Sequence, residues 1–246
     1  MGRAFEYRKA SKMKRWGAMS RLFPKLGKVI TMAAKAGSPD PDMNPRLRTA
    51  ILTAKAQNMP KHNIEAAIQR ASNKDTADIK ELHYEAKGPY GTQFIIDCAT
   101  DNNTRTVANV KAALTRNSAE MLTAGSLNFM FTRKSVFTFD KTAEMDIEEL
   151  ELELIDAGLE EIEEDMEPQE NDADDKNIIR IFGAFEAFGD LSKALEEMSI
   201  EVTKGEHQYI ANMPIELTDE QMEEVDVLID RLEEDEDVQS VYTNIN

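Results

Sequence analysis

The sequence predicts an α+β multidomain protein, in which an N-terminal helical domain precedes two packages of strands and helices. Three observations support this prediction. Apolar residues recur at helical spacing from about residue 20 to residue 73, whereas short β-like runs alternate with amphipathic stretches from residue 81 onward. The chain has 246 residues, which is longer than one average domain.

Three helices are predicted in the first part. The first should have Pro24 in its first turn and end at Gly37. Asn44 and Pro45 should start the second, and Pro60 should open the third. The apolar positions of the three helices are Phe23, Leu26, Val29, Ile30, Ala33 and Ala34, then Leu47, Ile51 and Ala54, then Ile64, Ala67, Ile68 and Ala71. The polar stretch SNKDTADIKE that follows is the expected hinge.

The first α/β package is predicted from three neighbouring segments. The runs LHYEAKG and TQFIIDCATD are typical of strands, and the turn KGPYG joins them. The segment NNTRTVANVKAALTRN predicts a helix with Val107, Val110 and Leu114 facing inward. The segment GSLNFMFTRKSVFTFDK predicts two short strands around Arg133 and Lys134.

The second package should begin with a helix capped by Asp146 and Glu149 and stopped by Gly158. Two strands, a helix and a third strand should follow, at residues 159–164, 177–184, 189–198 and 207–217. Thr218 and Gln221 cap a further helix, and VQSVYTNI predicts a last strand. Periodicity does not decide whether this last helix and strand belong to the second package or complete the first.

Charge is divided unevenly along the chain. The whole protein has a formal charge of −18, yet residues 1–80 carry +11 and residues 81–246 carry −29. Residues 8–28 contain no acid, and such basic clusters are typical of nucleic-acid contacts. The alternative interpretation is a solvated helix surface. The candidate nucleic-acid-binding residues in this basic segment are Arg8, Lys9, Lys12, Lys14, Arg15, Arg21, Lys25 and Lys28.

An acidic stretch occupies the second package. Residues 142–175 contain 17 acidic side chains and neither Lys nor Arg, so this stretch does not bind a phosphate backbone unaided. It is interpreted either as a solvated acidic surface or as a contact for a basic protein.

No catalytic motif is present in the sequence. It contains no nucleophile elbow, phosphate-binding glycine loop or paired-His motif, so we expect no enzyme, no catalytic residue and no small-molecule substrate. Cys98 lies in an apolar run and is expected to be a core residue, while His62, His83 and His207 lack ligand spacing. We therefore expect no metal and no cofactor. Without a signal-like or spanning segment, a cytoplasmic location without membrane contact is expected.

The segment TDNNTRT has two interpretations. Any one of Asp101, Asn102, Asn103 and Thr104 would cap the helix that follows. Free backbone N–H groups at that helix start, together with Arg105, would also suit a phosphate. Arg105 is therefore a ninth candidate contact for nucleic acid.

Several separated motifs resemble the YebC/PmpR family, which includes a mitochondrial translational activator. They are DPDMNPRLRTAILTAKAQNMPKHNIEAAI, KGPYGTQFIIDCATDNNTRTVANVKAALTRN, GSLNFMFTRKSVF and MPIELTDEQMEEV. The resemblance implies that the second α/β domain is inserted in the first. The predicted domains are then a basic helical domain at 1–79, a middle α/β domain at 80–140 plus 206–246, and an inserted acidic α/β domain at 141–205.

These observations together predict a non-enzymatic, nucleic-acid-binding regulator of gene expression. The resemblance implies a DNA-binding transcriptional regulator acting on promoter DNA. Two alternatives stay open, namely a translation factor that contacts ribosomal RNA on the ribosome, and a protein-interaction module that docks through its acidic domains. The composition does not separate DNA from RNA, because both present phosphate groups.

Overall fold

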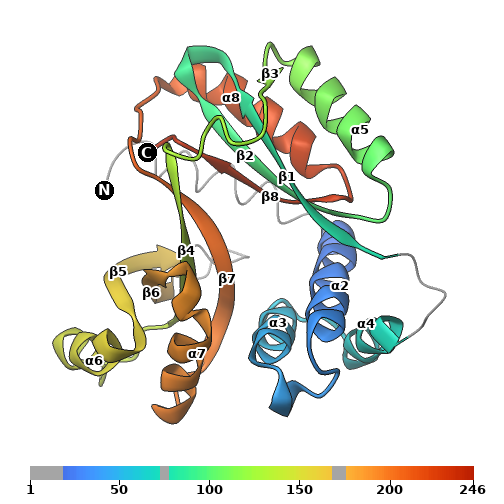
Figure 1. Ribbon diagram of the computed structural model, residues 1–246. Coiled ribbons are helices and arrows are strands. Elements are labelled where there is room, and N and C mark those ends of the chain that lie inside the picture. Colours follow the sequence, from blue (N-terminus) through green and yellow to red (C-terminus); the bar gives the residue numbers. More distant parts are fainter. Residues whose placement is uncertain (1–18, 73–77, 168–175) are drawn as a thin grey trace. The chain divides into compact units, whose positions relative to one another are not determined.

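The computed structural model describes residues 19–72, 78–167 and 176–246 (Figure 1). The fold is α+β, with a helical part at the N-terminus and two four-stranded sheets that carry helices. The described residues divide into two compact units, with residues 19–25, 78–132 and 209–246 in the first and residues 26–72, 133–167 and 176–208 in the second. The three predicted domain ranges stay a prediction. In the described ranges, no helix combines the length and apolarity needed to cross a membrane.

The helical part contains α2 (Met19–Ala36), α3 (Pro45–Ala56) and α4 (Lys61–Ser72). The predicted apolar stripes supply its interior only in part, because five of the predicted residues are half-buried, namely Phe23, Leu26, Val29, Ile68 and Ala71. Helix α2 begins earlier than predicted and contains Pro24 within it, because the apolar periodicity that starts at Phe23 does not report the preceding turn. The buried apolar side chains are Ile30, Ala33, Ala34, Leu47, Ala50, Ile51, Ala54, Met59, Ile64 and Ala67.

Asn44 joins α2 to α3, as the N-cap that the sequence predicts. Its side-chain oxygen accepts a hydrogen bond from the N–H of Leu47 at 3.1 Å. Its amide nitrogen donates to the carbonyl oxygens of Ala33 (2.9 Å) and Ser38 (2.8 Å). The buried amide therefore satisfies backbone groups at the end of one helix and at the start of the next.

The first sheet is antiparallel and has the strand order β3-β1-β2-β8. Its C-terminal strand pairs with β2, with Ile96 opposite Val241, so the end of the chain completes this sheet. The turn predicted at KGPYG lies between β1 and β2 and contains a short 3-10 helix. The strands are β1 (Lys80–Lys87), β2 (Gln93–Thr100), β3 (Glu120–Met121) and β8 (Val238–Thr243).

Helices α5 (Asn103–Arg116) and α8 (Asp219–Glu233) cover one face of the first sheet (Figure 1). The predicted capping box at Thr218 and Gln221 opens α8. Alternate residues of β2 face the helices because side chains of a strand alternate between its two faces. The core includes Phe94, Ile96 and Cys98 from β2, Val110 and Leu114 from α5, and Val225, Leu228 and Leu232 from α8.

The second sheet has the strand order β5-β6-β4-β7. Its strands are β4 (Phe131–Asp140), β5 (Leu159–Glu167), β6 (Lys176–Ala184) and β7 (Val202–Ala211). Helices α6 (Ile147–Leu154) and α7 (Phe188–Glu197) pack on it, and all of these elements lie between β3 and β8 in the chain. The second α/β package is therefore inserted in the first. Its core includes Phe137, Phe139, Leu150, Leu154, Ile179, Ile181, Leu191 and Leu195.

Besides α2, two strands differ from the sequence prediction. The segment around Arg133 and Lys134 is one strand, β4, and not two short ones. The strand runs on without a turn because its backbone pairs with β6 continuously, from Lys134 opposite Ala184 to Asp140 opposite Ile178. Strand β7 begins at Val202, five residues before the predicted start, and ends at Ala211.

The thiol of Cys98 lies in the core of the first sheet and is 2% exposed. Burial, followed by the nearby carboxylate of Asp235, raises the pKa of this thiol to about 12. The folded protein therefore keeps the thiol neutral, whereas the unfolded chain ionises it above about pH 9.

We expect slow reaction of Cys98 with a thiol reagent at pH 8 in the folded protein and fast reaction in urea. The stability that the neutral thiol contributes is fully present below about pH 9 and is lost as the pH rises toward 12. The free energy of unfolding should therefore fall more steeply over this range in the parent than in Cys98→Ala. Equal slopes, or fast labelling without urea, would contradict this assignment.

Candidate nucleic-acid interface

The structure places only part of the predicted basic segment. Arg8, Lys9, Lys12, Lys14 and Arg15 lie outside the described residues. Arg21, Lys25 and Lys28 lie in α2.

The three basic positions of α2 share one face of the helix. Residues 21, 25 and 28 have the spacing i, i+4, i+7, which aligns them along the helix axis. The buried position Ile30 lies about 180° away around the same helix, given about 100° per residue. Lys35 extends this row, because it lies seven residues after Lys28, and its side chain is exposed. Lys35 was not among the residues predicted from the sequence, although its seven-residue spacing from Lys28 identifies it.

Lys25 also contacts the first α/β package. Its ammonium donates a hydrogen bond to the backbone carbonyl of Glu233, in the last turn of α8, at 2.9 Å. The C-terminus of a helix has partial negative charge and unpaired carbonyls, so a lysine there is stabilising.

Further exposed cations lie on α3 and α4. Arg46, Lys55, Lys61 and Arg70 are all exposed, and Lys61 lies 3.7 Å from the carboxylate of Glu65. Residues 26–72 contain seven basic side chains and three acidic ones. The described helical part is therefore basic even without the segment that precedes it.

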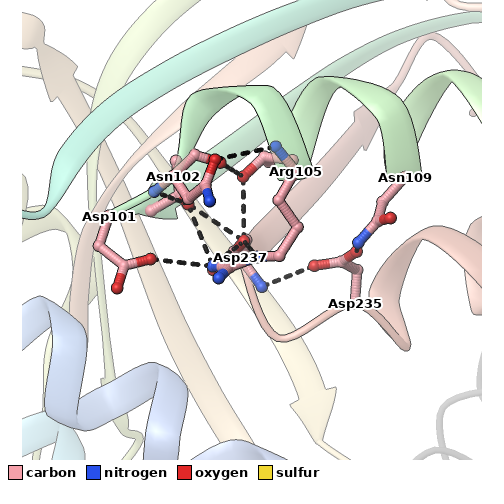
Figure 2. Close-up of polar contacts among 8 residues, drawn as sticks. Asp101, Asn102, Arg105, Asn109, Asp235 and Asp237 are labelled. Atoms are coloured by element: carbon pink, nitrogen blue, oxygen red, sulfur yellow. Dashed lines mark hydrogen bonds and ion pairs between the residues drawn. The ribbon is translucent and has the colours of Figure 1, made fainter.

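Arg105 lies in the first turn of α5, where Asn102 is the N-cap (Figure 2). The Asn102 side-chain oxygen accepts a hydrogen bond from the N–H of Arg105 at 3.1 Å. Asp101 does not cap the helix but accepts from the Arg105 guanidinium at 3.0 Å. One residue of TDNNTRT therefore caps α5, and its neighbour binds Arg105.

The second partner of Arg105 is Asp237, which is 2% exposed and lies just before β8. One carboxylate oxygen of Asp237 accepts four hydrogen bonds, two of them from the Arg105 guanidinium at 2.7 and 3.1 Å. The other two come from the buried hydroxyls of Thr100 (3.1 Å) and Thr106 (2.9 Å). The bond to Asp237 is the main cause of the raised pKa of Arg105.

Asp235 supports the same arrangement from the segment before β8 (Figure 2). Its carboxylate accepts from the Asn109 amide at 2.7 Å and from the N–H of Asp237 at 2.8 Å. One guanidinium thus faces the carboxylates of Asp101 and Asp237, with Asp235 beside them. This balance of charge favours a structural role for Arg105 over a phosphate contact, because a phosphate would add negative charge beside these carboxylates. A phosphate contact by Arg105 stays a prediction.

A solved structure has the same fold as this nested α+β chain. It is the crystal structure of a conserved hypothetical protein from Aquifex aeolicus, with a TM-score of 0.75 and 30% sequence identity. The similarity covers 92% of this chain and 90% of that one. This chain is therefore a multidomain α+β protein with a basic helical N-terminal part.

Family comparisons match both parts of the chain. The model of the TACO1/YebC protein N-terminal domain matches residues 3–74, and that of the TACO1/YebC second and third domain matches residues 79–245. The chain therefore belongs to the TACO1/YebC family. Two similar proteins, each named probable transcriptional regulatory protein, come from Sulfurovum sp. (strain NBC37-1) and Sulfurimonas denitrificans. They are 71% and 62% identical over 246 and 245 residues, with full coverage of both chains in each case.

Proposed function

We propose that this protein is a DNA-binding transcriptional regulator that contacts nucleic acid through its basic N-terminal segment and acts by binding, without catalysis. The observation that carries the proposal is the division of charge, with +11 on residues 1–80 and −29 on residues 81–246. The names of the two similar proteins support regulation of transcription.

The proposed contact combines the basic segment with α2. The eight cations between Arg8 and Lys28 form the interface, and Lys35 extends it along the same face of α2. The acidic body limits non-specific adsorption, because it repels the same polyanion that the basic segment attracts. Phosphate contacts of this kind position a protein, and a specific sequence needs additional contacts with base edges.

Binding should depend strongly on salt. Neutralising six to eight phosphates releases bound counterions, so we expect a log–log slope of affinity against salt of about −5 to −7 on duplex DNA. The measurement is a fluorescence-anisotropy titration of the full chain with labelled duplex at several salt concentrations. A slope near zero, or no binding at low salt, would contradict the proposed interface.

Crosslinking in cells, followed by sequencing of the bound DNA and RNA, distinguishes promoter DNA from ribosomal RNA as the target. Enrichment of promoter DNA supports the proposal. Enrichment of ribosomal RNA would instead assign the protein to translation, with the same basic segment as the contact.

A further inference from the structure

Two segments of the first compact unit lack charge. Charged residues make up 31% of the chain, yet residues 121–132 and 209–215 contain none. The segments are separated by more than 75 residues of sequence, but hydrogen bonds place them side by side. The N–H of Asn212 donates to the carbonyl of Met130 at 2.8 Å, and the Asn212 amide donates to the carbonyl of Phe129 at 3.0 Å.

This arrangement leaves large apolar side chains in solvent. Phe129 is 71% exposed and Met213 is 59% exposed. Asn128, Asn212 and Pro214, their neighbours along the chain, are exposed as well. We call these five residues the neutral patch.

The backbone beneath the neutral patch is held firmly. Both carboxylate oxygens of Glu85 accept hydrogen bonds from this loop, from the N–H of Gly125 at 2.6 Å and from the N–H of Leu127 at 2.7 Å. Gly125 has a φ of +89°, a conformation that glycine adopts readily. The side chains of Leu127 and Met130 are buried under the loop. Phe129, which lies between them in the chain, is therefore held in solvent by a turn whose neighbouring residues are fixed.

The second segment is anchored at both ends. The Asn212 side-chain oxygen accepts from the Thr132 hydroxyl at 2.7 Å, and the N–H of Ile215 donates to the carbonyl of Asn244 at 2.7 Å. Met213 and Pro214 lie between these anchors. A surface that is ordered before binding loses little conformational freedom when a partner binds, which favours affinity.

We infer that the neutral patch is the docking surface for a protein partner that has a basic surface and presents an apolar pocket to Phe129 and Met213. Centres of protein interfaces are depleted in charge and enriched in aromatic residues and Met. Nucleic acid does not fit this surface, because the two segments contain no cation for a phosphate.

The charge around the neutral patch selects the partner. Residues 78–132 and 209–246 of the first compact unit contain 18 acidic and six basic side chains, a net charge of −12, and exposed Glu216 directly follows the second segment. A basic partner is attracted by this field. The inference does not depend on nucleic-acid binding by the basic segment.

The test begins with a photo-crosslinking amino acid, p-benzoylphenylalanine, at position 129 of the full chain in living cells. The control is the same group at Val227, which is 60% exposed on α8 and lies outside the neutral patch. We expect an adduct with one polypeptide of positive net charge from position 129 and not from position 227. Adducts only with nucleic acid or with a second copy, or no adduct at all, would overturn the inference.

The crosslinked polypeptide is then purified and titrated with the parent and two variants. Phe129→Ser combined with Met213→Ser should weaken this binding by at least about tenfold, whereas Val227→Ser should change it by less than about twofold. DNA or RNA affinity and the melting temperature should stay unchanged in both variants, because the replaced side chains are exposed and lie outside the basic segment. Equal affinity of the double variant and the parent for the polypeptide would refute the docking role.

Discussion

Replacing Lys14 and Arg15 together by glutamate is expected to weaken binding to DNA or RNA by at least about tenfold at low salt. The change removes two attractive charges from an uninterrupted basic run and adds two repulsive ones. The log–log slope of affinity against salt should also become shallower by about 2, because two phosphate contacts are lost. Gel-shift titrations of parent and variant at several salt concentrations measure both quantities.

The matched control is Lys111→Glu with Arg116→Glu. Both residues are exposed on α5, and their replacement changes the net charge by the same amount. If the basic segment is the contact, the control should bind nearly as tightly as the parent. Equal weakening by both double variants would show that only total charge matters, and unchanged binding of the Lys14 and Arg15 variant would refute the proposed interface.

The largest stability effect is expected from Asp237→Ala. This change removes the acceptor of four hydrogen bonds and leaves the buried hydroxyls of Thr100 and Thr106 without that carboxylate. We expect the free energy of unfolding to fall by about 2–4 kcal/mol, below the full cost of a broken buried ion pair because Arg105 is half-exposed. Urea unfolding followed by circular dichroism measures the loss, with exposed Glu223→Ala as a control that should change stability by less than about 0.5 kcal/mol.

Two further variants separate the interpretations of TDNNTRT in the same experiment. Arg105→Ala should cost about 1–2 kcal/mol, since the buried Asp237 carboxylate keeps its two hydroxyl donors but loses its cation. Asn102→Ala should cost about 0.5–2 kcal/mol through loss of the helix cap. If Arg105→Ala instead leaves stability unchanged and weakens binding of nucleic acid, Arg105 is a phosphate contact.

Local signals in the sequence were sufficient for most of the helices and strands. Asn44 and Thr218 cap α3 and α8 as predicted, because an N-cap depends on residues within one turn of the helix. The turn between β1 and β2 and the cap of α6 at Asp146 were likewise predicted from adjacent residues. The basic face of α2 follows from helical spacing alone, which also identifies Lys35.

Only the tertiary structure decided how distant segments pair. Periodicity did not decide which α/β package contains the last strand. In the structure β8 pairs with β2 of the first sheet, which lies about 140 residues earlier in the chain. Strands pair through backbone N–H and C=O groups, which every residue type except proline supplies alike. The pairing of β2 with β8 was therefore not predictable from the residues of the two strands. The bond between Arg105 and Asp237 spans 132 residues, and Asn212 contacts Phe129 across 83 residues. The sequence alone therefore determined the local elements and the division of charge, whereas packing of the chain against itself placed Arg105 in a structural network and assembled the neutral patch.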